Sequence, residues 1–203
     1  MSLSKKILWI LMAAFAIAIG FYPAIYFLAD RNFGLLSSKS NELLSNVFWN
    51  IGFYTHIIFG GIALLIGWVQ FGSKFRNQNL KLHKVIGIVY MMSVLCSSIA
   101  GIGIGFFATG GIVASSGFIS LGLIWFFTTL MAYLKIKRKQ IKLHQKFMIY
   151  SYAACFAAVT LRIWLPLLIM AFGNFITAYT IVAWLCWIPN LIVAHLIIRR
   201  IEL

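Results

Sequence analysis

Acidic residues are scarce in this chain of 203 residues, which has three of them: Asp30, Glu42 and Glu202. All three lie outside the long apolar runs, so those runs contain no carboxylate pair, no Ser-His-Asp set and no carboxylate relay for protons. The sequence also lacks an HExxH motif and a phosphate-binding glycine loop. These absences leave no site for the familiar hydrolytic chemistries and weigh against an ordinary proton-coupled transporter.

Cysteine shows no useful pattern either. Cys96, Cys155 and Cys186 fall inside apolar runs, where cysteine behaves as a small hydrophobic residue. There is no CxxC spacing and no pattern typical of a secreted disulfide framework. The cysteines therefore do not indicate a compartment.

What the chain has in abundance is apolar surface. It is 63% hydrophobic and 10% charged, with a mean hydropathy of +0.97, whereas a soluble domain is about half apolar and roughly a quarter charged. The composition predicts a polytopic membrane protein. The net charge of +14 comes from basic residues in short segments between apolar runs. This arrangement favours topology signals and contacts with anionic membrane lipids over nucleic-acid binding.

Six apolar runs are long enough to cross the hydrocarbon core, which takes roughly 20 helical residues. Backbone groups in lipid must satisfy their own hydrogen bonds, so each run is expected to be a helix. We expect an all-α bundle of six transmembrane helices, forming a single domain over residues 1–203 with an uncleaved first span. The expected spans are about 7–28, 47–72, 85–108, 112–134, 147–172 and 175–198.

The orientation follows from the basic residues. The N-terminus, the second and fourth connectors and the C-terminal tail together hold 14 Lys and Arg, against Arg31 and Lys39 on the opposite side. This asymmetry predicts that both termini are cytoplasmic, in a multi-pass protein of the inner membrane. The outer connector over residues 29–46 contains SSKSNELLSN, which predicts either a surface turn or a short interfacial helix.

One arginine, Arg162, lies deep within the fifth run. Both it and His56 are expected about 22 Å from the inner boundary, since each lies 15 residues from the cytoplasmic end of its span. A charge at this depth normally faces an interior cavity, and no span supplies an acidic partner. A ligand is therefore expected to supply the partner: an anionic group, a quinone carbonyl, a heme propionate or a lipid phosphate. Four further side chains expected at the same depth complete the predicted ligand site: Tyr22, Tyr26, Ser97 and Tyr179.

A structural alternative stays open for this arginine. Pro166 is a helix breaker, and a helix ending there would leave residues 167–173 as a re-entrant turn. Arg162 would then extend to the outer headgroups.

A second set of candidates lies near the cytoplasmic boundary: His83, His144 and His195. Two histidines on facing helices at one depth would suit a b-type heme, and imidazole is also a common zinc or copper ligand. The alternative is that they contact headgroups or cap neighbouring helices. His83 and His144 are the last residues of two similar tetrapeptides, LKLH and IKLH, which lie 61 residues apart. This similarity is either an internal repeat or a general likeness of basic connectors.

Three segments carry a resemblance to a known family: THIIFGGIALLIGWVQF, KLHKVIGIVY and HQKFMIYSYAACFAAVTLRIWLP. They resemble the predicted membrane protein family called domain of unknown function 2306, over roughly residues 47–170. The resemblance implies no activity, but it marks these positions as carrying the family pattern: His56, His83, Gly87, Tyr90, His144, Met148, Tyr152 and Arg162. Lys84 and Tyr150 depart from it, because the family tends to have arginine there. A looser similarity links the chain to diheme cytochromes of the b561 and ferric-reductase type, although His56 has no histidine partner on the fourth span.

We therefore expect a membrane protein that binds a small anionic or quinone-like ligand in the outer half of the bilayer, with redox chemistry at a b-type heme as an extension. The alternative is a non-enzymatic assembly factor or subunit that binds lipid or a helix of a partner membrane protein. The sequence leaves open whether the chain is an enzyme.

Overall fold

The computed structural model describes residues 3–28 and 34–202, and this part of the chain is helical throughout, with no strand. Six of its helical segments are long and apolar enough to cross a membrane, which confirms the predicted fold class. They span Lys6–Leu28, Val47–Phe71, Leu80–Gly105, Gly111–Lys137, Ile141–Phe172 and Phe175–Arg200.

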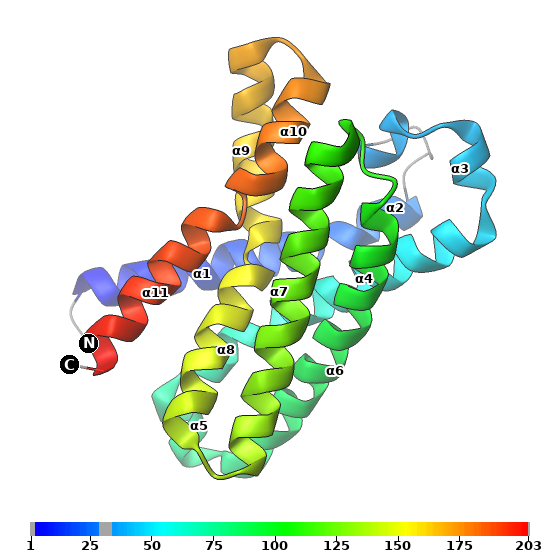
Figure 1. The fold of residues 1–203 in the computed structure, drawn as a ribbon. Helices are drawn as coiled ribbons and strands as arrows, with labels where there is room; N and C mark the ends of the chain where they lie inside the picture. The colour runs from blue at the N-terminus through cyan, green and yellow to red at the C-terminus, as the bar shows by residue number, and fades with distance from the viewer. Residues whose placement is uncertain (1–2, 29–33, 203) are drawn as a thin grey trace.

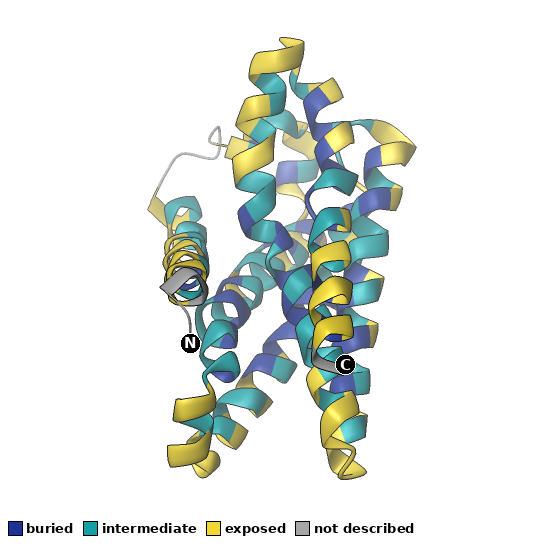
Figure 2. Ribbon diagram, turned by 90° about the vertical axis from the view of Figure 1, so that its left-hand side faces the viewer, coloured by how far each residue is buried: buried dark blue, intermediate teal, exposed yellow. Residues whose placement is uncertain are grey.

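The central helices are α4 (Val47–Gly67), α6 (Leu80–Gly105), α7 (Gly111–Lys137) and α8 (Ile141–Cys155). α7 packs between α6 and α8, and α4 packs along α6 (Figure 1). α1 (Leu3–Gly20) crosses α4 at an incline, while α9 (Ala157–Phe172) and α10 (Phe175–Leu185) form a hairpin at one end of the bundle. The last helix, α11 (Ile188–Glu202), packs on α8. Buried residues follow the inward faces of these helices, and exposed residues gather at their ends and outer faces (Figure 2).

Helices α6 and α8 begin five and six residues before the predicted spans, at Leu80 and Ile141. Each carries lysines in its first turns, which the apolar criterion excluded from the span. A helix does not have to end where the hydrocarbon ends, because long lysine side chains reach the headgroup layer. The expected starts were therefore too late for a helix, although suitable for a hydrocarbon boundary.

The fifth and sixth spans are each broken near the middle, at Phe156 and at Cys186–Trp187. Pro189 has no N–H with which to continue the ladder from α10 into α11. The carbonyl of Cys186, which lies in the break itself, accepts a bond of 3.0 Å from Asn190 Nδ2 and a bond from Thr160 Oγ1. Asn190 also donates to Thr160 Oγ1 at 3.1 Å. These side chains join the two breaks and satisfy backbone groups that lipid cannot.

Helix α9 continues through Pro166 to Phe172, so the re-entrant turn considered above is not present. A proline inside a helix cannot donate to the carbonyl four residues earlier, which here belongs to Arg162. The helix ends instead after Phe172, where Gly173 caps it with a φ of 63°, a left-handed conformation that suits glycine.

The described part of the outer connector forms two short helices, η2 (Gly34–Ser38) and α3 (Asn41–Ser45), which agrees with the helical alternative. Leu36 and Leu44 are buried against Trp49 and Phe53 of α4. Lys39 Nζ donates to Phe107 O at 2.5 Å and to Thr109 Oγ1 at 3.0 Å. The connector is thus fastened over the end of the bundle where α6 turns into α7.

Candidate functional site

Arg162 of α9 points toward the first span. Its Cζ lies 4.1 Å from the ring centroid of Tyr22, which is a cation–π contact. Nη1 donates to Ala158 O of its own helix at 2.8 Å, while Nε is buried without a hydrogen-bond partner among the described residues. The guanidinium is therefore partly buried between α9 and the first span, and its buried Nε has no acceptor among the described residues.

The first span bends where it approaches this arginine. α1 ends at Gly20, and the 3-10 turn η1 (Tyr22–Ala24), with Pro23 inside it, leads into α2 (Ile25–Leu28). Tyr22 and Tyr26 consequently lie edge to face, with centroids 5.8 Å apart, and Tyr26 interacts electrostatically with Arg162. A single helical turn thus presents two phenol rings to the guanidinium.

Gly34 of the connector covers the two phenol hydroxyls. A Cβ at Gly34 would lie 3.1 Å from Tyr26 Oη and 3.7 Å from Tyr22 Oη. Its φ of 59° also favours glycine. The neighbouring Leu35 donates its N–H to Tyr26 Oη at 3.4 Å. The connector therefore forms the outer wall of the site, which sequence reasoning did not foresee.

His56 of α4 contacts Ser97 of α6 through two groups. His56 Nδ1 lies 2.9 Å from Ser97 O and 3.2 Å from Ser97 Oγ, while Ser97 Oγ donates to His56 O at 2.8 Å. The approach is possible because Gly101 has no side chain: a Cβ there would lie 2.7 Å from His56 Nδ1. His56 also interacts electrostatically with Arg162. The absence of a side chain at Gly101 of α6 thus makes room for the histidine ring.

Tyr179 of α10 completes the predicted set. Its ring packs against Phe118 and Phe175, with centroids 5.2 and 5.3 Å away, and it interacts electrostatically with Tyr26. The structure thereby brings together the six side chains predicted to bind a ligand, from α1 to α10. We call this group the outer site: Tyr22, Tyr26, His56, Ser97, Arg162 and Tyr179.

The three predicted metal ligands are arranged differently. His83 and His144 are near enough to interact electrostatically, whereas His195 Nδ1 lies 2.9 Å from the hydroxyl of Tyr150. His144 Nδ1 is bonded to Ala132 O at 2.9 Å, and His83 Nδ1 is buried without a partner. Over residues 3–28 and 34–202, no three His, Cys, Asp or Glu side chains gather as a metal site would require.

A buried network of three hydroxyls lies farther along α6 and α8, seven residues after His83 and His144. Tyr90 Oη is 2.8 Å from Ser151 Oγ, which is 2.6 Å from Thr129 Oγ1, and Thr129 donates to Trp125 O at 2.8 Å. Each of these three hydroxyls has an acceptor for its proton, so the network joins α6, α7 and α8 and leaves none of the three without a hydrogen bond. Its role is to hold the three helices in register.

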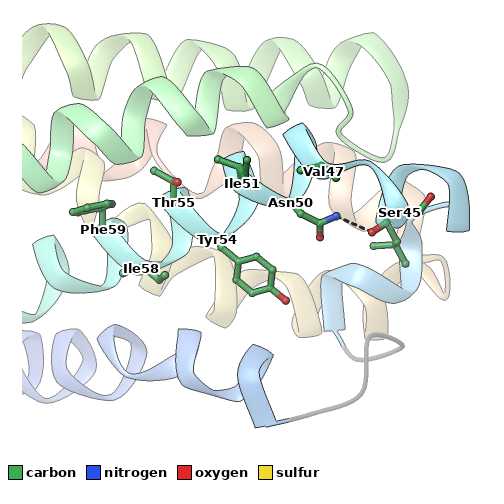
Figure 3. Close-up of a pocket in the computed structure, with 9 residues that line it drawn as sticks. Ser45, Val47, Asn50, Ile51, Tyr54, Thr55, Ile58 and Phe59 are labelled. Carbon is green, nitrogen blue, oxygen red and sulfur yellow. Dashed lines mark hydrogen bonds between the residues drawn. The ribbon is translucent and has the colours of Figure 1, made fainter.

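An open groove of about 560 Å³ runs along a different face of α4. Figure 3 shows Ile51, Tyr54, Thr55, Ile58 and Phe59 along it, and the bond from Asn50 near its end, where Asn50 Nδ2 donates to Leu44 O at 2.7 Å. None of the six outer-site residues lines the groove. This groove was not predicted, since an apolar run does not show where a helix surface is hollowed.

Comparison with known proteins gives one family and no individual relative. A family model described as "Predicted membrane protein (DUF2306)" matches residues 53–198. No curated protein and no solved structure matches the chain.

Proposed function

The chain belongs to the DUF2306 family of predicted membrane proteins, and we propose that it binds a small anionic or quinone-like ligand at the outer site. The observation that carries the proposal is Nε of Arg162, which is buried with no hydrogen-bond partner among the described residues, in a guanidinium that lies over the ring of Tyr22. A buried donor without a partner costs about 1–3 kcal/mol, and more when the group is charged. An oxygen of a bound molecule would remove this cost.

The surroundings of Arg162 support a ligand from outside the polypeptide. No span contains an aspartate or a glutamate, and the tyrosine ring beneath the guanidinium offsets only about 0.5–2 kcal/mol of its burial. Arginine in such a position donates well-directed hydrogen bonds to carbonyl, carboxylate or phosphate oxygens. In a reaction, Arg162 would stabilise negative charge on the ligand, and His56 would exchange a proton with it.

We place this site in the outer half of a cytoplasmic membrane. Its support is the distribution of Lys and Arg, of which 14 lie on the side of the two termini. The same basic connectors would bind anionic lipids of the inner leaflet.

Redox chemistry is a second candidate function, with a b-type heme between His83 and His144. Its support is that the two histidines are near enough to interact electrostatically and that Nδ1 of His144 is directed to a backbone carbonyl, which leaves Nε2 for a metal. We expect the protein purified from heme-supplied cells to show a Soret band that His144→Ala removes and His195→Ala retains. A colourless wild-type preparation would refute the heme.

A non-enzymatic assembly role, with lipid or a partner helix as the bound species, is the alternative to ligand chemistry. Its support is the groove on α4, whose lining is largely apolar and faces outward along the span. Cross-linking from Ile58 in the groove to a lipid or to a second protein would favour this role, provided that the same preparation holds nothing at Arg162.

The test of the ligand proposal is extraction and mass spectrometry of protein purified in mild detergent. We expect wild type to carry about one small molecule per chain, Arg162→Gln to lose it, and Arg138→Gln to retain it, because Arg138 is exposed in the basic connector after α7. Wild type and Arg162→Gln are also supplied with a short-chain quinone and with decyl phosphate. If wild type carries nothing and binds neither probe, or if Arg162→Gln binds as wild type does, the proposal is wrong.

A further inference from the structure

We infer that the ligand of the outer site is a hydroquinone: a neutral ring whose hydroxyl donates to His56 Nε2 and whose second oxygen accepts from Arg162 Nε. The inference rests on the proposed function and deepens it, because it selects one of the two ligand classes that Arg162 alone would admit.

The hydrogen bonds of Ser97 fix the tautomer of His56. Ser97 Oγ uses its single proton on the backbone carbonyl of His56, at 2.8 Å. The two Ser97 atoms near His56 Nδ1, the carbonyl oxygen and Oγ, can therefore only accept. Nδ1 must carry the ring proton and donate it. In the neutral ring, Nε2 is then a hydrogen-bond acceptor.

The ring has good reason to be neutral. It lies between α4 and α6 inside a membrane-spanning bundle and near the guanidinium of Arg162. A second positive charge there would add repulsion to the cost of removing a charge from water. A neutral Nε2 presents a lone pair, which attracts an O–H group and repels a carboxylate or phosphate oxygen.

Arg162 supplies the opposite polarity. Its unused Nε donates, and the ring of Tyr22 already faces its positive charge at 4.1 Å. This contact reduces the need for a full negative charge on the ligand. The site therefore presents one donor and one acceptor, and a hydroquinone carries both complementary groups on one rigid ring.

The remaining walls suit an uncharged aromatic molecule. Tyr22, Tyr26 and Tyr179 bring three aromatic rings to the site, and such rings stack well against another ring. Moving a carboxylate-sized anion into an apolar interior costs several kcal/mol, whereas a hydroxyl that gains a partner costs little. Burial thus favours the neutral ligand as well.

The experiment compares three probes on the purified full-length protein: decylubiquinol, its dimethyl ether, and decyl phosphate. The ether keeps the ring and tail but has no hydroxyl donor. We expect decylubiquinol to bind wild type at least tenfold more tightly than the ether or decyl phosphate. A lost hydrogen bond to a buried acceptor is expected to have at least this effect.

A variant of His56 tests the hydroxyl end of the ligand. His56→Asn retains an N–H directed toward Ser97 O but lacks the acceptor, so we expect at least a tenfold loss for decylubiquinol and no change for the ether. His195→Asn is the matched control, since that ring lies on α11 against Tyr150. Nitrogen-15 spectra of histidine-labelled wild type provide a measurement that needs no variant to fold. The Nε2 signal of one of the four histidines should move with decylubiquinol and not with the ether.

The outcomes separate the two levels of the argument. Binding of decyl phosphate that requires Arg162, without binding of decylubiquinol, would overturn the hydroquinone and leave the proposed ligand site standing. If neither probe binds in a way that depends on Arg162, both proposals fall. Equal binding of decylubiquinol and its ether, or an Nε2 signal that stays in place, would also overturn the inference.

Discussion

Replacing Gly101 with alanine tests the contact on which the position of His56 depends. The added Cβ would lie 2.7 Å from His56 Nδ1 and 2.9 Å from Cε1, whereas ordinary contacts begin at 3.4 Å. The ring must therefore retreat by about 0.7 Å or more. A shift of this size lengthens the bond from Nδ1 to Ser97 O beyond its present 2.9 Å.

The energetic cost has two parts. Overpacking a filled interface costs about 1–3 kcal/mol, and weakening the histidine bond in a buried setting costs about 1–3 kcal/mol more. Alanine gains about 1 kcal/mol over glycine in a helix. Gly103→Ala on the same helix receives this gain without a clash, since nothing lies within 4 Å of its Cβ position. Relative to Gly103→Ala, we expect Gly101→Ala to be less stable by about 2–6 kcal/mol.

Thermal unfolding in detergent measures this difference. For a chain of this size, each kcal/mol corresponds to about 2–4 °C, so the midpoint for Gly101→Ala should lie at least about 4 °C below that for Gly103→Ala. Ligand binding should weaken in Gly101→Ala alone. Equal midpoints for the two variants would refute the reasoning, because the histidine would then have moved at no cost.

Three further predictions concern other parts of the fold. Asn190→Ala should lower stability by about 1–3 kcal/mol, because it removes a donor to the carbonyl of Cys186 at the break in the sixth span; thermal unfolding measures this. Partial burial lowers the pKa of Lys39 from 10.5 to about 8. Between those values the unfolded chain binds more protons than the folded chain, so stability should rise as pH rises from about 8 toward about 10.5, and Lys39→Met should lose this slope. Gly34→Ala should cost about 1–2 kcal/mol because of its positive φ, and should also weaken ligand binding because its Cβ would press on Tyr26 Oη.

Each of these three predictions has a matched control variant. Asn77→Ala removes an exposed asparagine from α5 (Ser73–Gln78), and Lys74→Met removes an exposed lysine from the same helix. Gly111 has a φ of 70° with nothing within 4 Å of its Cβ position, so Gly111→Ala carries the backbone strain without a contact. Loss of ligand in Gly111→Ala, an unchanged pH slope in Lys39→Met, or equal midpoints for Asn190→Ala and Asn77→Ala would each contradict the corresponding prediction.

Much of the outer site could be predicted because a helix rises by a fixed amount per residue. Counting from the basic ends grouped Arg162 with Tyr22, and the structure has these two side chains in contact, whereas the binding of a ligand stays a prediction. The direction in which each side chain points around its helix was harder to predict, since these helices are apolar on nearly every face. The fit of His56 against Gly101 therefore emerged only from the structure.

Other features depend on contacts between distant segments. Pro189 is visible in the sequence as a helix breaker, but nothing there indicates that Asn190 and Thr160 bond the carbonyl of Cys186 at the break. The role of Gly34 depends on a connector folding back over two tyrosines from the preceding span. His195 looked equivalent to the other two histidines because depth alone cannot distinguish one side of a bundle from another.

The bond between Tyr90 and Ser151 has a consequence for the origin of the bundle. Tyr90 lies seven positions after His83, and Ser151 lies seven positions after His144. The two histidines are therefore 61 residues apart, as are Tyr90 and Ser151, and this is also the separation of LKLH from IKLH. Tyr90 and Ser151, at corresponding positions of the two segments, are hydrogen-bonded, and His83 and His144, at another such pair of positions, interact electrostatically. Contacts of this kind are what a local two-fold axis between α6 and α8 produces, as in a symmetric dimer where each residue faces its own copy. A chain that arose by tandem duplication of a self-pairing hairpin would keep such contacts along its seam, and exchanging the side chains of Tyr90 and Ser151 would then be better tolerated than changing either one alone.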